Sequence, residues 1–193
     1  MTDIADYAMR LHYALLDTDP AKIETAINIL TAAFEDEYTI YTCGNGGSAA
    51  ISNHLVCDCV KGVACDTDYH PRIVSLNSND SLITAIANDI GYEYIFSKQI
   101  DWSSMIDEVL LVISSSGNSP NIVNALKSAR MQGLKTIAIV GFDGGQCKRL
   151  ADCCIHIPSD NYGIVEDASQ AIMHYMAQSI RIRNSKNPEK LKL

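Results

Sequence analysis

The sequence predicts an α/β fold in which a parallel, doubly wound sheet lies between two layers of helices, a three-layer αβα sandwich. Short apolar runs alternate with segments whose apolar residues recur at helical spacing over most of the 193 residues. The run 109–113 (Val-Leu-Leu-Val-Ile) is continuously apolar, which is typical of a parallel strand covered on both faces. Two Gly- and Ser-rich stretches each follow a strand-like run and precede a helix-compatible one.

The chain begins with a predicted helical arm. Apolar residues recur at helical spacing over 3–16, and the following Asp-Thr-Asp-Pro breaks this pattern. Pro20 is well placed to start a second helix over about 21–34, because proline is favoured in the first turn. Two helices therefore precede the first strand.

Strands and helices then alternate to the end of the chain. The strands are predicted at 38–42, 72–76, 109–113, 136–140 and 153–157. The helices are predicted at 48–60, 81–87, 121–132 and 165–183. Asn79 or Asp80 would cap the second of these helices, and Gly133 would close the third.

No internal repeat or linker interrupts this order, so one domain is expected over 1–193. It would comprise N-terminal helices (1–36), a ligand-binding core (37–183) and a polar tail that frays (184–193).

Composition narrows the class of protein. A hydrophobic fraction of 47% is enough for a full core in one domain of this length. The net charge of −8 argues against a general nucleic-acid binder, although a local phosphate site stays compatible with it. No run of about 18 apolar residues predicts a membrane span. The acidic N-terminus lacks the pattern of a signal peptide, so a cytoplasmic protein is expected.

The chain has seven cysteines, an odd number without a zinc-finger or thioredoxin spacing. Cys57-x-Cys59 and the pair Cys153-Cys154 are compatible with metal or redox chemistry. Small buried thiols in a reducing compartment are the simpler interpretation.

The two Gly/Ser stretches carry the main indication of a ligand. The first runs from Tyr41 to Ser48 (Tyr-Thr-Cys-Gly-Asn-Gly-Gly-Ser), and the second from Ser114 to Pro120 (Ser-Ser-Ser-Gly-Asn-Ser-Pro). A strand that ends in such a loop and leads into a helix presents backbone N–H groups, hydroxyls and a helix dipole to an anion. Both loops would lie at the carboxyl edge of the sheet, where ligands bind. A phosphorylated small molecule is the predicted ligand.

Two helices carry side chains suited to proton or metal chemistry. His54 and Asp58 are four residues apart, so they share a helix face and could be two ligands of one metal, an acid/base pair or a plain surface pair. Glu166, Gln170 and His174 recur at four-residue steps on the last helix, either as part of the same pocket or as an exposed polar stripe.

These motifs, taken together, resemble those of the SIS (sugar isomerase) domain superfamily. The resemblance rests on Cys43–Ala50 with His54, on Leu82–Asp89, on Ile113–Asn121 and on Asp143-Gly144-Gly145. Within the superfamily the chain is similar to the phosphoheptose isomerases. The resemblance implies a flavodoxin-like fold and interconversion of sedoheptulose 7-phosphate and D-glycero-D-manno-heptose 7-phosphate for heptose biosynthesis.

The resemblance also implies roles for individual residues. Residues implied in phosphate and sugar binding are Asn45, Gly46, Gly47, Ser48, Asn88, Asp89, Ser114, Ser115, Ser116, Ser119 and Glu166. One Zn²⁺ per subunit would be held by His54, Asp58, Glu166 and His174. Asp58 would be the base and His174 the acid. Two of these positions depart from the family pattern, since Asp58 replaces a glutamate and Glu166 a glutamine.

The family further implies a homotetramer with active sites at subunit interfaces. The altered residues 58 and 166 favour a rival interpretation, a non-catalytic sugar-phosphate sensor or a regulator of a replication initiator. An isomerase for a different sugar phosphate is a third alternative.

Overall fold

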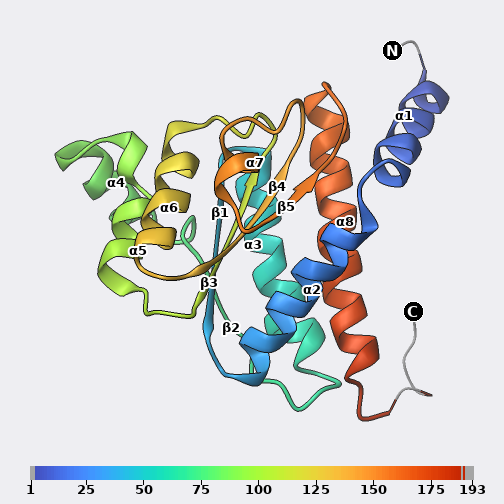
Figure 1. The fold of residues 1–193 in the computed structure, drawn as a ribbon, viewed down its shortest axis with the longest axis horizontal. Helices are drawn as coiled ribbons and strands as arrows, with labels where there is room; N and C mark the ends of the chain where they lie inside the picture. Colours follow the sequence, from blue (N-terminus) through green and yellow to red (C-terminus); the bar gives the residue numbers. More distant parts are fainter. Residues whose placement is uncertain (1–2, 188, 190–193) are drawn as a thin grey trace.

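The computed structural model describes residues 3–187 and 189. Its centre is a five-stranded sheet in which all neighbouring strands are parallel, with the order β2-β1-β3-β4-β5 (Figure 1). The strands are β1 (Thr39–Gly44), β2 (Arg72–Ser75), β3 (Val109–Ser114), β4 (Lys135–Val140) and β5 (Cys153–His156). The chain moves from β1 to the edge strand β2 and then returns to the other side of β1. The switch point of the doubly wound sheet therefore lies between β1 and β3.

Helices cover both faces of this sheet, which confirms the predicted sandwich (Figure 1). The α-helices are α1 (Ile4–Leu16), α2 (Pro20–Glu35), α3 (Gly47–Cys57), α4 (Asp80–Asp89), α5 (Ser97–Ser103), α6 (Pro120–Met131), α7 (Cys147–Leu150) and α8 (Tyr162–Arg183). One core joins the sheet to α2, α3 and α8, and a second joins it to α4, α5, α6 and α7. Alternate β3 residues such as Leu111 and Leu110 point into these two cores, as the pleat of a strand requires.

The helix predicted over 48–60 changes its winding at Asp58. The α-helix α3 ends at Cys57, and a π-helix follows over Asp58–Val63. In that segment the N–H of Ala64 donates to the carbonyl of Cys59, five residues back. Cys59 and Val63, which are four residues apart in this segment, are both buried. π-helical turns occur frequently at functional sites.

Three short elements were not predicted from the sequence: α5, α7 and a 3₁₀ turn over Tyr92–Tyr94. Each has seven residues or fewer, too short to display a clear helical period. Helix α8 also starts three residues earlier than predicted, because the side chain of Asn161 caps it by accepting a hydrogen bond from the Ile164 N–H.

The N-terminal arm packs against α8, where the Tyr7 hydroxyl donates to Asp167 over 2.6 Å. Four large apolar side chains of α1 are nevertheless exposed: Ile4, Met9, Tyr13 and Leu16. At the other end, Asn184 accepts a hydrogen bond from the Tyr69 hydroxyl, and the N–H of Lys186 donates to Asp66. The start of the predicted tail is thus tied to the core, whereas 188 and 190–193 lie outside the described residues. None of the described helices is long and apolar enough to cross a membrane.

Candidate active site

The two Gly/Ser loops meet at the switch point between β1 and β3. They border a cavity of about 140 Å³. Its lining consists of Asn45, Ser48, Ile113, Ser114, Ser115, Ser116, Ser119, Tyr162 and Glu166. Five serine hydroxyls thus surround one small space, with Ser48, Ser114 and Ser115 buried. The structure brings these serines together at the carboxyl edge of the sheet, where the two loops were predicted to lie.

The helices that begin at these loops lack side-chain caps. Gly46, at the N-cap of α3, has φ 55° and no side chain to offer, and Ser119 at the N-cap of α6 makes no capping hydrogen bond. The other long helices are capped by side chains of Asp3, Asp19, Asn79 and Asn161. Since the first N–H groups of a helix need an acceptor, the uncapped starts of α3 and α6 suit an anion.

Asn45 is held in place by residues that sequence reasoning missed. Its amide exchanges two hydrogen bonds, of 2.9 and 2.8 Å, with the amide of Asn121, and its Oδ1 accepts a third from Tyr92 at 3.3 Å. Asn77 fixes the preceding residue, accepting from the Gly44 N–H and donating to the Gly44 carbonyl. Asn121 directly follows the second loop, so its position in the sequence was a usable signal.

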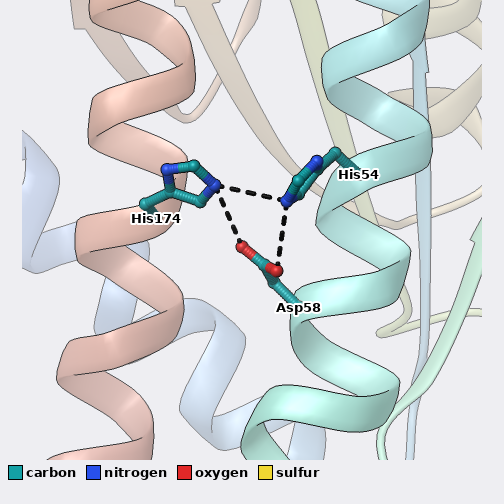
Figure 2. Close-up of side chains that lie close together, drawn as sticks. All are labelled: His54, Asp58 and His174. Atoms are coloured by element: carbon teal, nitrogen blue, oxygen red, sulfur yellow. Dashed lines mark hydrogen bonds and ion pairs between the residues drawn. The ribbon is translucent and has the colours of Figure 1, made fainter. Parts of the chain in front are cut away.

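A second group of side chains lies further along α3 and α8 (Figure 2). His54 Nε2 is 3.3 Å from Asp58 Oδ1, and His174 Nε2 is 3.5 Å from Asp58 Oδ2. The two Nε2 atoms are themselves 3.3 Å apart. Asp58 therefore faces both imidazoles from below, one carboxylate oxygen toward each ring (Figure 2). The side chains of His54, Asp58 and His174 are 49%, 26% and 40% exposed, so a ligand can reach them.

Glu166 lies apart from this group. A Cβ built on Gly47 would meet its carboxyl carbon and both oxygens at 2.4–2.6 Å, so the carboxylate rests against the first residue of α3. It lines the serine cavity. Its role in sugar-phosphate binding stays a prediction, and its place in the lining of the serine cavity favours that role. Its role as a metal ligand also stays a prediction, although the cluster of three ligand atoms does not include it.

Asn88 and Asp89 are exposed at the end of α4, where the Asn88 amide donates to Asp89 at 2.7 Å. They do not line the serine cavity. Their contact with a sugar stays a prediction.

The donor set of the cluster fits a divalent cation. Ligand atoms at about 2.0–2.1 Å from a tetrahedral Zn²⁺ lie about 3.3–3.4 Å from one another. The two Nε2 atoms, 3.3 Å apart, match that spacing, and each lies 3.3–3.5 Å from a different oxygen of Asp58. One ligand atom from each of the three residues lies within 4.8 Å of the others. Each Nε2 could donate to its Asp58 oxygen or, as the unprotonated nitrogen of a neutral ring, offer a lone pair to a cation.

The cysteines take no part in this site. All seven are free thiols, and burial raises the pKa of both Cys59 and Cys147 to about 12. A buried thiol with so high a pKa stays protonated and is a poor nucleophile and metal ligand. Four cysteines are buried, as the interpretation as small buried thiols expects: Cys43, Cys59, Cys147 and Cys153. Cys57 and Cys65 are exposed and do not fit it.

Known proteins share both the sequence and the fold. The SIS domain family model matches residues 5–141. The phosphoheptose isomerase of Sulfurimonas denitrificans is 35% identical over 159 residues, which are 82% of this chain and 81% of that protein. The phosphoheptose isomerase of Akkermansia muciniphila is also 35% identical, over 82% of this chain and 83% of its own.

Two solved structures superpose on most of the chain. Phosphoheptose isomerase from Neisseria gonorrhoeae gives a TM-score of 0.83 at 28% identity, covering 91% of this chain and 95% of its own. A phosphoheptose isomerase from Francisella tularensis gives 0.85 at 27% identity, covering 91% and 93%. The chain is therefore a member of the SIS domain family and belongs among its phosphoheptose isomerases.

Proposed function

We propose that this chain is an aldose–ketose isomerase that converts sedoheptulose 7-phosphate to D-glycero-D-manno-heptose 7-phosphate with the help of a bound divalent cation. The observation that carries the proposal is the pairing of two sites along the same two helices. The serine cavity lies where α3 begins, and the His54–Asp58–His174 cluster lies where α3 ends. The relatives named phosphoheptose isomerase support the choice of substrate.

The serine cavity anchors the phosphate in this proposal. Hydroxyls of Ser48, Ser114, Ser115, Ser116 and Ser119 donate to phosphate oxygens, and the uncapped N-termini of α3 and α6 add backbone N–H groups. The partial positive charge of each helix N-terminus favours the negative ligand. Gly46 and Gly47 let the ligand approach the backbone, and Asn45, fixed by Asn121, presents its amide to the sugar.

The distance between the two sites suits a long sugar. Seven residues separate Gly47 from His54 and eight separate Glu166 from His174, which corresponds to about 10–12 Å along a helix. In an open-chain heptulose 7-phosphate, seven bonds join the phosphorus to the carbonyl carbon. Each bond is about 1.5 Å long and advances an extended chain by about 1.3 Å along its axis, so the seven bonds span about 9 Å. A triose phosphate would span only about 4 Å by the same count.

The cluster supplies the proton chemistry. Isomerisation requires removal of a proton from the carbon beside the carbonyl and stabilisation of the enediolate oxygen that results. Asp58 is the proposed base and His174 the proposed acid. A cation held by His54, Asp58 and His174 would polarise the carbonyl oxygen and offset the developing negative charge. Zn²⁺ is the proposed ion because two imidazoles and a carboxylate are ligands that it commonly takes.

We further propose that the protein works as a homotetramer with its active sites between subunits. The exposed apolar residues of α1 support an association surface, as does the exposure of His54 and His174, because a second subunit would shield the reaction from water. Seven free thiols support a cytoplasmic location. Light scattering of the purified protein would measure the assembly.

The activity is tested by incubating the purified chain with Zn²⁺ and sedoheptulose 7-phosphate in D₂O and following the product by NMR. The proposal expects the aldose to accumulate with solvent deuterium at C2. A protein that binds the sugar phosphate and leaves it unchanged would instead be a sensor.

A further inference from the structure

The His54–Asp58–His174 cluster contains one more polar side chain, that of Gln170. Gln170 Nε2 lies 2.9 Å from His174 Nε2, a shorter separation than those of His174 Nε2 from His54 Nε2 (3.3 Å) or Asp58 Oδ2 (3.5 Å). Gln170 stands one helical turn before His174 on α8, so both side chains lie on the same face. The glutamine is partly buried.

The amide of Gln170 is suited to ligate a cation in this position. A carboxamide carries a donor nitrogen and an acceptor oxygen at equivalent places, and half a turn about its last bond exchanges them. Without a cation, the N–H₂ group donates to the lone pair of His174. When a cation takes that lone pair, the N–H₂ group loses its acceptor, and the rotated amide directs Oε1 toward the positive charge.

Glu166 is the other residue of α8 that could have been the fourth ligand, and its position argues against this. Its carboxylate rests on Gly47 beside the serines. It is eight residues from His174, about 12 Å along the helix, whereas Gln170 is about 6 Å away.

We propose that Gln170 Oε1 is the fourth protein ligand of the cation, in place of Glu166. This inference rests on the metal site of the proposed function. It changes the charge of that site: two imidazoles, one carboxylate and one neutral amide leave a divalent ion with a net charge of +1, whereas Glu166 as a ligand would bring it to zero. A net positive site stabilises an enediolate oxygen more strongly. Glu166 is left free to accept a hydrogen bond from a sugar hydroxyl.

The affinity of the protein for Zn²⁺ tests the proposal directly. It is measured on the full-length, metal-free protein by competition with a chromophoric chelator. We expect Gln170→Ala to weaken Zn²⁺ binding at least about tenfold, the lower end of what even residues behind the ligands contribute. Gln170→Glu should restore the affinity, because it supplies a carboxylate oxygen at the same place. Glu166→Ala, which leaves no ligand atom on that side chain, should keep the affinity within about threefold of wild type.

Gln178 provides a matched control. It stands one turn after His174 on the same helix and lines a cavity with His174 and Asp58, but it makes no hydrogen bond to His174 among the described residues. Gln178→Ala should therefore bind Zn²⁺ like wild type. Substituting Co²⁺ gives a second readout, because loss of a ligand in Gln170→Ala should alter the visible absorption bands, whereas Gln178→Ala should leave them unchanged.

The proposal is overturned if Gln170→Ala keeps wild-type affinity and spectrum, or if Glu166→Ala or Gln178→Ala is the variant that loses Zn²⁺. Circular dichroism of each metal-free variant separates a lost ligand from a lost fold. The outcome is independent of turnover: a wild-type protein that binds Zn²⁺ through Gln170 but does not isomerise sedoheptulose 7-phosphate would contradict the proposed function alone.

Discussion

The Nε2 atoms of His54 and His174, which are 120 positions apart in the sequence, lie 3.3 Å from each other. They are brought together by the parallel packing of α3 and α8 on one face of the sheet (Figures 1 and 2). The same packing sets Glu166 against Gly47 about two turns earlier. Two helices thus align the serine cavity with the His54–Asp58–His174 cluster.

Removing the negative charge of Asp58 should abolish catalysis while the fold persists. We expect Asp58→Asn to lower kcat at least about 100-fold, because the proposed base is lost, and to weaken Zn²⁺ binding at least about tenfold. Asp68→Asn is the matched control, since its carboxylate is exposed and, within the described part of the chain, forms an ion pair only with Lys186. Steady-state kinetics and zinc titration measure both effects. If Asp58→Asn turns over as fast as wild type, the assignment of the base is wrong.

Glu166→Gln should bind inorganic phosphate more tightly than wild type. The carboxylate borders the serine cavity, where its charge repels an anion. Two unit charges about 4 Å apart in water repel by about 1 kcal/mol, so a gain of about fivefold or more in affinity is expected. Isothermal titration with phosphate, which has no sugar hydroxyls, isolates this effect.

Glu93→Gln makes the same change of charge at an exposed residue and should leave phosphate affinity unaltered. Weaker phosphate binding by Glu166→Gln would mean that the carboxylate organises the pocket instead of opposing the anion.

The link between Tyr7 and Asp167 should make docking of α1 sensitive to alkaline pH. The hydrogen bond to Asp167 raises the pKa of Tyr7 from 10.0 to about 12. A group whose pKa is raised by folding contributes stability that is complete below its unfolded pKa and declines as pH rises toward the folded value. The stabilisation should therefore be full below about pH 10 and be lost between about pH 10 and 12.

Thermal unfolding of wild type and Tyr7→Phe at a series of pH values would follow this loss. The difference in Tm should be present at pH 8 and should shrink above pH 10. Tyr13→Phe, on the exposed side of α1, should match wild type throughout. A difference for Tyr7→Phe that stays constant up to pH 11 would contradict the account.

Thiol reactivity should separate the seven cysteines by burial. Cys57 and Cys65 are exposed, whereas burial raises the pKa of Cys59 and Cys147 to about 12. We expect Ellman's reagent to modify Cys57 and Cys65 quickly in the native protein, and the double variant with serine at both positions to lose that fast phase. Rapid labelling of Cys59, mapped by mass spectrometry, would show that the π-helical segment opens.

The sequence allowed much of this architecture to be predicted, because its signals are local. The apolar run of β3, the two Gly/Ser loops and the four-residue spacing of His54 and Asp58 each follow from neighbouring residues. Spacing on α8 placed Glu166 and His174 on one face, but it could not tell which part of α3 each would meet. That depends on how the two helices pack.

Other features of the site depend on contacts between distant segments. The amide pair of Asn45 and Asn121 joins residues 76 positions apart; the place of Asn121 after the second loop hints at a role, but its partner is evident only from the packing. The π-helical turn at Asp58 packs Cys59 and Val63 into the core, and no local pattern indicates the change of winding. These are tertiary effects that override the local preference for an α-helix.

The central claim is that the cation cluster and the serine cavity act on one sugar phosphate. Its most direct test is the conversion of sedoheptulose 7-phosphate by the purified protein, measured by NMR in D₂O before chelation, after removal of metal, and after Zn²⁺ is restored. The account predicts aldose carrying deuterium at C2, loss of turnover on chelation and recovery with Zn²⁺. Turnover that persists undiminished in the metal-free protein, or no aldose from the zinc-loaded protein, would contradict it.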